Sequence, residues 1–229
     1  MTDIPSMLFG ITIWAIPLIF AVTLHEAAHG YAARACGDDT AERMGRISLN
    51  PLRHIDPFGT IILPGLLLAA GGVMFGWAKP VPVNFARLRH PRSGMIIVAA
   101  AGPAMNMALA ISAVLAVNLI PRVPEAMQAW FVLNLDNAIY FNLLLAIFNM
   151  IPVPPLDGGR VLVGILPRHI GWQVAKLEKA GILIILGALF LLPMAGRALG
   201  MDLDVFQWLV QGPVDGLGRW LVRILGSYG

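Results

Sequence analysis

Apolar residues fall into five long stretches of the chain, at about 7–33, 58–76, 94–120, 131–151 and 180–195. Four of these stretches approach the roughly 20 residues that a helix needs to cross about 30 Å of hydrocarbon. The stretch 58–76 is shorter, and Pro64, Gly65, Gly71 and Gly72 interrupt it. The pattern therefore predicts four membrane-spanning helices and, at 58–76, a re-entrant segment that enters the membrane and returns on the same side.

A sixth stretch, at about 205–225, mixes Trp208, Trp220 and leucines with Asp215 and Arg219. Such a mixture is typical of an amphipathic helix at the membrane surface or of a weakly apolar span. Two polar connections, 45–57 and 76–86, are rich in proline, asparagine and β-branched residues, which favours short strands near 45–54 and 79–85. We therefore expect an all-α polytopic membrane protein with about 4–6 membrane segments and a small membrane-associated β-element.

The composition agrees with a membrane protein, because 58% of the 229 residues are hydrophobic, 13% are charged and the mean hydropathy is +0.75. We expect a single integral-membrane domain over 1–229, with a core at 8–165 and C-terminal helices at 176–229. The single cysteine, Cys36, excludes a disulfide within the chain. The first apolar run is too long for a signal peptide, so we expect it to be a retained membrane helix.

Basic residues are arranged in bands between the apolar stretches. The bands contain Arg34, Arg43, Arg46 and Arg53, then Lys79, Arg87, Arg89 and Arg92, and later Arg160, Arg168, Lys176 and Lys179. If 58–76 is re-entrant, all three bands lie on one side, which the positive-inside rule assigns to the cytoplasm. We therefore expect a multi-pass protein of the cell membrane, with its N-terminus outside. The net charge of only +3 and this banding argue against nucleic-acid binding.

The stretch FAVTLHEAAHGYAARA, residues 20–35, places His25, Glu26 and His29 within an apolar helix. Ionisable side chains inside a membrane are costly and mark function by default. Histidines four residues apart share one face of a helix, so both can bind one Zn²⁺, with Glu26 as general base. His25 precedes Arg34 by nine residues, which is about 14 Å along a helix. We therefore expect a metal site near the cytoplasmic face.

A catalytic zinc site keeps three protein ligands, so a third ligand is needed. Asp157 in FNMIPVPPLDGGRVL is the strongest candidate, because prolines end the preceding helix and two glycines permit a tight turn. Taken alone, this sequence would favour an ordinary turn that ends a helix. The other candidates adjoin basic residues, helix ends or an outer loop, and we expect them at the membrane surfaces: His54, His90, His169 and Asp136.

Three of the asparagines in the apolar stretches are candidates for the site or for contacts between helices. Asn106 ends the sequence AGPAMN, and Asn142 and Asn149 are on one face of the 131–151 helix. Buried asparagines commonly form hydrogen bonds between membrane helices, which we expect of Asn142 and consider as the alternative for Asn106. Asn149 adjoins the proline break before Asp157, where it could serve the site.

The motifs HEAAHG, AGPAMN and FNMIPVPPLDGGR occur in an order that resembles the site-2 protease family of intramembrane zinc metalloproteases. The resemblance covers about residues 8–165, and GWAKPVPVN is similar to the compact prokaryotic branch, whose membrane β-element would lie here. It implies one Zn²⁺ per chain held by His25, His29 and Asp157, and Glu26 as the catalytic base. It also implies that Asn149 and Asn106 contact the substrate.

The resemblance further implies that the substrate is the transmembrane helix of another membrane protein, cleaved within or near the lipid bilayer. We expect neither of the PDZ and CBS modules that many relatives carry. Two other functions would use the same residues: a membrane metal transporter and a non-catalytic metal-binding scaffold. Transporters show repeated halves and a path of polar positions, which we do not find in this sequence, and Glu26 argues against a scaffold. The substrate, the scissile bond, the regulatory trigger and the oligomeric state are left open.

Overall fold

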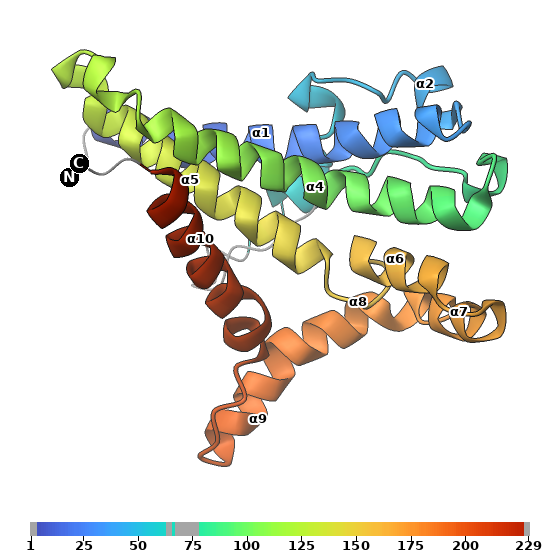
Figure 1. Ribbon diagram of the computed structural model, residues 1–229. Helices are drawn as coiled ribbons and strands as arrows, with labels where there is room; N and C mark the ends of the chain where they lie inside the picture. The colour runs from blue at the N-terminus through green and yellow to red at the C-terminus, as the bar shows by residue number, and fades with distance from the viewer. Residues whose placement is uncertain (1–3, 63–65, 67–77, 227–229) are drawn as a thin grey trace.

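The computed structural model describes residues 4–62, 66 and 78–226. Three long helices, α1 (Ile4–Ala35), α4 (Pro91–Val117) and α5 (Glu125–Asn149), pack together as a bundle (Figure 1). Among the described residues, these helices and the run Glu178–Ala198 are long and apolar enough to cross a membrane. The stretches predicted at 7–33, 94–120, 131–151 and 180–195 thus coincide with helices of spanning length. The chain is a membrane protein with several spanning helices.

The fourth span is a continuous helical run made of α8 (Glu178–Leu186), η5 (Gly187–Leu191) and α9 (Leu192–Ala198). It starts against the proline-rich loop 150–156, and the packing is so close that a Cβ on Gly181 would lie only 1.6 Å from the carbonyl oxygen of Pro154. The run then leaves the bundle at an angle (Figure 1). Its apolar side chains, such as Leu183 and Leu191, are exposed on the protein and suited to contact lipid.

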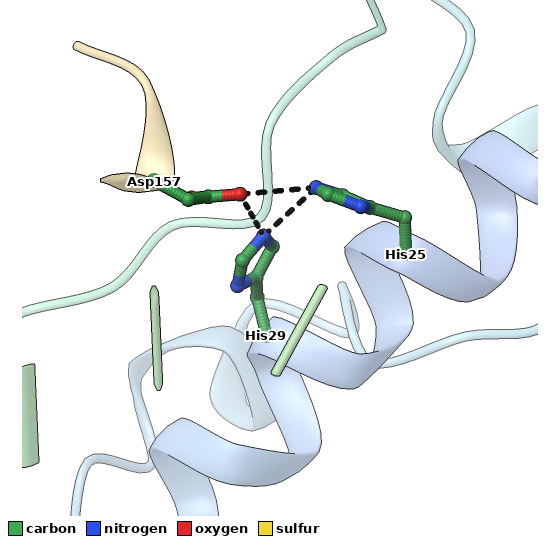
Figure 2. A group of neighbouring side chains, drawn as sticks. All are labelled: His25, His29 and Asp157. Carbon is green, nitrogen blue, oxygen red and sulfur yellow. Dashed lines mark hydrogen bonds and ion pairs between the residues drawn. The ribbon is translucent and has the colours of Figure 1, made fainter. Parts of the chain in front are cut away.

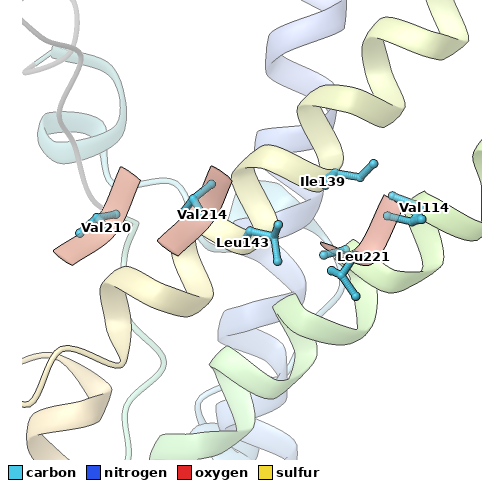
Figure 3. Close-up of a cluster of buried hydrophobic side chains, with 8 residues drawn as sticks. Val114, Ile139, Leu143, Val210, Val214 and Leu221 are labelled. Carbon is cyan, nitrogen blue, oxygen red and sulfur yellow. The ribbon is translucent and has the colours of Figure 1, made fainter. Parts of the chain in front are cut away.

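The stretch at 205–225 folds as η6 (Gln207–Gln211) followed by the amphipathic helix α10 (Gly212–Leu225). Val210, Val214 and Leu221 are buried against Val114 of α4 and Leu143 of α5 (Figure 3). This cluster fixes the C-terminal helix to the bundle. α10 has 14 residues and is not among the candidate spans.

Short elements connect the long helices. They are α2 (Thr40–Arg43), η1 (Pro51–Arg53), η2 (Pro57–Ile62), η3 (Phe85–Arg87), η4 (Ile120–Arg122), α6 (Asp157–Ile165) and α7 (Arg168–Ala175). The π-helix η2 begins the stretch 58–76. The rest of that stretch, apart from Leu66, lies outside the described residues, so the re-entrant segment stays a prediction.

The predicted β-element is wrong, because the described part of the chain contains no strand and residues 46–50 and 78–84 are irregular. The physical reason lies in what pairs with the backbone of 78–84. Pro80 and Pro82 have no N–H to donate, and the amide of Val81 donates to a carboxylate on α1. The guanidinium of Arg46 donates to the carbonyls of Lys79 and Pro80, at 2.9 and 3.3 Å. Side chains thus bind groups that a neighbouring strand would have used.

Candidate metal centre

One face of α1 carries His25 and His29, one helical turn apart and only 7% and 9% exposed. The imidazoles lie against α4 at Gly102, where a Cβ would come within 2.4 Å of His29 Nε2 and 2.6 Å of His25 Nε2. A residue with any side chain at this position would displace the histidines. Gly102 therefore permits the close approach of α1 and α4 at this level.

Asp157 is the first residue of α6, directly after the proline loop that follows α5. Two glycines follow it, and a Cβ on either would lie 2.2 Å from backbone atoms: Gly158 from the carbonyl oxygen of Met150, and Gly159 from the nitrogen of Pro154. The glycine pair thus lets the start of α6 pack against the end of α5. In this position Asp157 is 7% exposed and its carboxylate points at the histidines (Figure 2).

Three ligand atoms converge in this group. His25 Nε2 lies 3.0 Å from His29 Nε2, and Asp157 Oδ2 lies 3.3 Å from each of them (Figure 2). A tetrahedral metal with bonds of about 2.0–2.1 Å separates its ligand atoms by about 3.3 Å. The spacing of the three atoms therefore fits one metal ion bound by all of them.

The hydrogen bonds of the two Nδ1 atoms determine which nitrogen of each imidazole carries the proton. His29 Nδ1 lies 2.7 Å from the carbonyl oxygen of Val98, which can only accept, so this nitrogen carries the proton. His25 Nδ1 lies 2.5 Å from Asn106 Oδ1 and donates to it in the same way. Both Nε2 lone pairs then face Asp157 Oδ2, which is buried without a hydrogen-bond partner. Three electron-pair donors that face one another in this way form a set suited to bind one cation.

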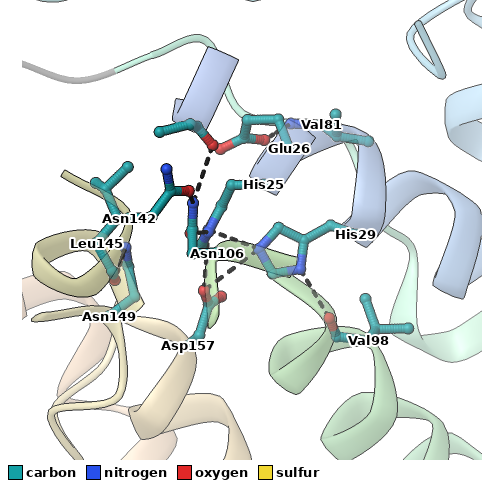
Figure 4. Close-up of polar contacts among 11 residues, drawn as sticks. His25, Glu26, His29, Val81, Val98, Asn106, Asn142, Leu145, Asn149 and Asp157 are labelled. Atoms are coloured by element: carbon teal, nitrogen blue, oxygen red, sulfur yellow. Dashed lines mark hydrogen bonds and ion pairs between the residues drawn. The ribbon is translucent and has the colours of Figure 1, made fainter. Parts of the chain in front are cut away.

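Asn106 lies behind His25 and is completely buried. Its amide nitrogen donates to the carbonyl of Ala21, at 3.1 Å, and to Asn142 Oδ1, at 2.8 Å (Figure 4). Asn142 in turn donates to the carbonyl of Ala138 on its own helix, at 2.8 Å. A buried polar network therefore joins α1, α4 and α5 and ends at His25. The expected interhelical hydrogen bond of Asn142 is present.

Glu26 and Asn149 lie at the edge of the group. Glu26 is half-buried, and its Oε2 accepts a hydrogen bond of 2.7 Å from the amide of Val81 (Figure 4). Asn149 is the last residue of α5 and is also half-buried, and its side-chain nitrogen donates to the carbonyl of Leu145 at 3.0 Å. Both side chains are thus more accessible than the three ligand residues.

The remaining candidates from the sequence lie elsewhere. His54 is buried within the protein, and its Nε2 lies 2.8 Å from the carbonyl of Ser48. His90 precedes α4, His169 lies on α7 and Asp136 on α5, and all three are exposed. Among the described residues, only His25, His29 and Asp157 form a group that could hold a metal. Gly102 belongs to the motif AGPAMN, and its contact with α1 agrees with the usual role of small residues in packing between membrane helices.

The sequence pattern of peptidase family M50 matches residues 13–129 and 117–194, which include all three residues of this group. The chain belongs to peptidase family M50. This is the site-2 protease family that the motifs resemble, and the M50 protein described here is a zinc metalloprotease.

Relatives of this M50 protein include YwhC of Bacillus subtilis (strain 168), named as a candidate zinc metalloprotease. It is 40% identical over 188 residues, which are 80% of this chain and 82% of YwhC. A second candidate zinc metalloprotease, Rip2 of Mycolicibacterium smegmatis, is 29% identical over 180 residues, or 78% of this chain and 66% of Rip2. Rip2 of Mycobacterium tuberculosis (strain H37Rv) is 26% identical over 191 residues, or 83% and 70%. No solved structure matches the M50 chain.

Proposed function

We propose that this M50 protein is an intramembrane endopeptidase that cleaves transmembrane segments of membrane proteins. The observation that carries the proposal is the position of the metal group. His25 and His29 lie on α1, a helix apolar enough to cross a membrane, rather than on a soluble domain. A hydrolytic site built into a spanning helix is accessible to peptide bonds at membrane depth.

The residues present fit one Zn²⁺ per chain, held by His25 Nε2, His29 Nε2 and Asp157 Oδ2. This set of two imidazoles and one carboxylate is typical of catalytic zinc, which keeps a further position for water or substrate. When bound, zinc supplies a Lewis acid that polarises the scissile carbonyl and lowers the pKa of water.

Glu26 is proposed as the general base. It takes the proton of the attacking water and returns it to the leaving amine. The amide of Val81 binds only Oε2 of this carboxylate, so Oε1 is left to accept the proton. An amide donor to one oxygen also restricts the rotation of the glutamate side chain, which keeps the base in one orientation.

A substrate helix must unwind before cleavage, because each carbonyl within a helix is hydrogen-bonded and surrounded by side chains. The freed backbone groups then need partners in a water-poor site. Asn149 is proposed to bind them, since it is half-buried at the end of α5, just before the loop that leads to Asp157. Asn106 is proposed to orient His25 instead of contacting the substrate, because its whole amide group is engaged within the protein.

The site is proposed to lie near the cytoplasmic face. Contacts between the three basic bands support this orientation. Arg46 donates to the carbonyl of Lys79, Arg87 pairs with Asp39 at 2.8 Å, and Arg92 donates to the carbonyl of Leu166 at 2.6 Å. The bands thus gather at one end of the bundle, and the positive-inside rule assigns this end to the cytoplasm.

The experiment compares wild type with Glu26→Gln after purification in detergent. The substrate is a single-span fusion protein whose transmembrane helix carries glycine near its middle. We expect both proteins to hold about one zinc by metal analysis, and only wild type to cleave. Glu42→Gln is the control, because Glu42 pairs with Arg34 on the surface, at 3.0 Å. Cleavage by Glu26→Gln at the wild-type rate would contradict the proposal.

A further inference from the structure

Asp38 is a completely buried carboxylate just beyond the end of α1. α1 ends in a Schellman motif, in which Gly37 N donates to the carbonyl of Arg34 at 3.0 Å and Asp38 N to that of Ala33 at 2.9 Å. Gly37 has a φ of +108°, which glycine adopts without strain. This motif fixes the backbone of Asp38 relative to the helix that carries Glu26.

The carboxylate of Asp38 has a full set of donors. Its Oδ1 accepts hydrogen bonds from the amide of Thr40, at 3.0 Å, and from the Thr40 hydroxyl. Its Oδ2 accepts a hydrogen bond of 2.6 Å from the amide of Asn84. Burying a charge is costly unless the charge is hydrogen-bonded in this way. An aspartate that only capped the turn would be more stable in solvent. The burial of Asp38 therefore indicates that its carboxylate also serves to bind the amide of Asn84.

The irregular segment 78–84 is held to the region of α1 by two of its amides. Val81 N donates to Glu26 Oε2 at 2.7 Å, and Asn84 N donates to Asp38 Oδ2 at 2.6 Å. Val81 is flanked by Pro80 and Pro82, which have no amide hydrogen to donate. Two carboxylates, one at the metal group and one at the helix end, thus hold the 81–84 part of this segment, while the guanidinium of Arg46 and the carbonyl of His54 hold residues 79 and 80.

We propose that Asp38 is a positioning residue for the peptidase reaction: by binding the amide of Asn84 it places the amide of Val81, which orients the carboxylate of Glu26. The inference rests on the proposed role of Glu26 as general base. Asp38 does not bind Glu26 itself. It acts through the two residues that separate Val81 from Asn84, and this short link limits how far the Val81 amide can move from its place.

The test measures Asp38→Ala on the single-span fusion substrate, with hydrogen exchange of the peptide that covers 78–84. We expect kcat to fall about ten- to hundredfold, as a displaced catalytic group does, with KM within about twofold and zinc content unchanged. Exchange should become faster in 78–84 but not in α4 or α5. A purely structural role would instead lower zinc content and leave kcat per zinc-loaded molecule unchanged, which would overturn the inference.

Asp39→Ala is the matched control, because the neighbouring Asp39 pairs with Arg43 and Arg87 on the surface, at 2.6 and 2.8 Å. We expect its kcat to stay near that of wild type. If Asp38→Ala does not fold, Asp38→Asn and Thr40→Val replace it, since each keeps part of the hydrogen-bond set and should give a smaller loss of kcat. A kcat within twofold of wild type in a variant with faster exchange at 78–84 would also overturn the inference.

The variant Glu26→Gln distinguishes a failure of the positioning role of Asp38 from a failure of the proposed function. If Glu26→Gln is inactive while Asp38→Ala is fully active, only the positioning role of Asp38 fails. If Glu26→Gln cleaves like wild type, the proposed function fails as well.

Discussion

The carbonyl of His54 accepts a hydrogen bond of 2.9 Å from the amide of Lys79, so the residues on either side of 58–76 meet at one place. A stretch with adjacent ends can enter the membrane and return, whereas a single crossing would separate its ends by the thickness of the bilayer. This relationship supports the re-entrant prediction.

Labelling of single cysteines tests this topology. In a Cys36→Ser background, cysteines at the exposed positions Glu42, Ala86 and Gln173 should react only from the cytoplasmic side, because all belong to the end with the basic bands. A cysteine at Ala126, at the start of α5, should react only from outside. Reaction of the Ala86 position from outside would show that 58–76 crosses the membrane.

Removal of the carboxylate of Asp157 should empty the metal site. We expect Asp157→Ala to lose nearly all zinc, because two neutral imidazoles alone bind zinc far more weakly than a set of three ligands. Metal analysis after dialysis against a weak chelator measures the loss. Asp136→Ala is the control, since Asp136 is an exposed aspartate on α5. Full zinc in Asp157→Ala would mean that another residue supplies the third ligand.

Asn106→Ala should weaken zinc binding without removing a ligand. The change leaves His25 Nδ1 and the carbonyl of Ala21 without their partner, and loss of such an outer hydrogen bond costs about 10–100-fold in metal affinity. Competition with a fluorescent zinc chelator gives the affinity. If zinc affinity is unchanged and only KM rises, Asn106 contacts the substrate after all.

Asn149→Ala should keep its zinc and cleave poorly, because the proposed partner of the unwound substrate is lost. Additional glycine or proline near the scissile bond of the fusion substrate should partly restore the rate, since these residues lower the cost of unwinding. Cleavage rates across substrates of graded helix stability measure the effect in wild type and variant. Rates that do not depend on that stability in either protein would refute this role of Asn149.

Acid should destabilise the protein in part through Asp38. Burial raises the pKa of Asp38, but the hydrogen bonds from Thr40 and Asn84 and the charge of Arg87 outweigh it, so the pKa lies below its ordinary value. A pKa that is lower in the folded state than in the unfolded state stabilises the fold. This stabilisation is complete above the unfolded pKa of about 3.9, and it is lost as the pH falls through the folded pKa. Thermal unfolding in detergent should therefore depend less on pH in Asp38→Asn over this acidic range. Equal pH dependence in both proteins would contradict the assignment.

Local patterns were sufficient to predict the parts of the site that lie within one element. His25 and His29 share a helix face by spacing alone, and the four spans follow from hydropathy along the chain. The prediction of a β-element failed because proline and β-branched residues occur both in strands and in irregular segments. What decides between them is distant in sequence: the carboxylate of Glu26 and the guanidinium of Arg46 bind the backbone of 78–84.

Local sequence patterns could not predict how the elements pack against one another. Asn106 gave no sign that it faces His25, because its partner depends on which face of α4 meets α1. Asp38 adjoins Asp39 in a polar connection, so the sequence does not distinguish the buried carboxylate from the half-buried one. Only the approach of residue 84 to the end of α1 separates them.

The ligand atoms of the metal group come from elements that are far apart in the sequence: α1 supplies two and α6 the third. During synthesis, α1, α4 and α5 are complete before Asp157 has been made. A growing chain therefore contains the histidines and the glutamate before it contains the full ligand set. The order of the elements thus delays completion of the metal group until the three long helices of the bundle have been made.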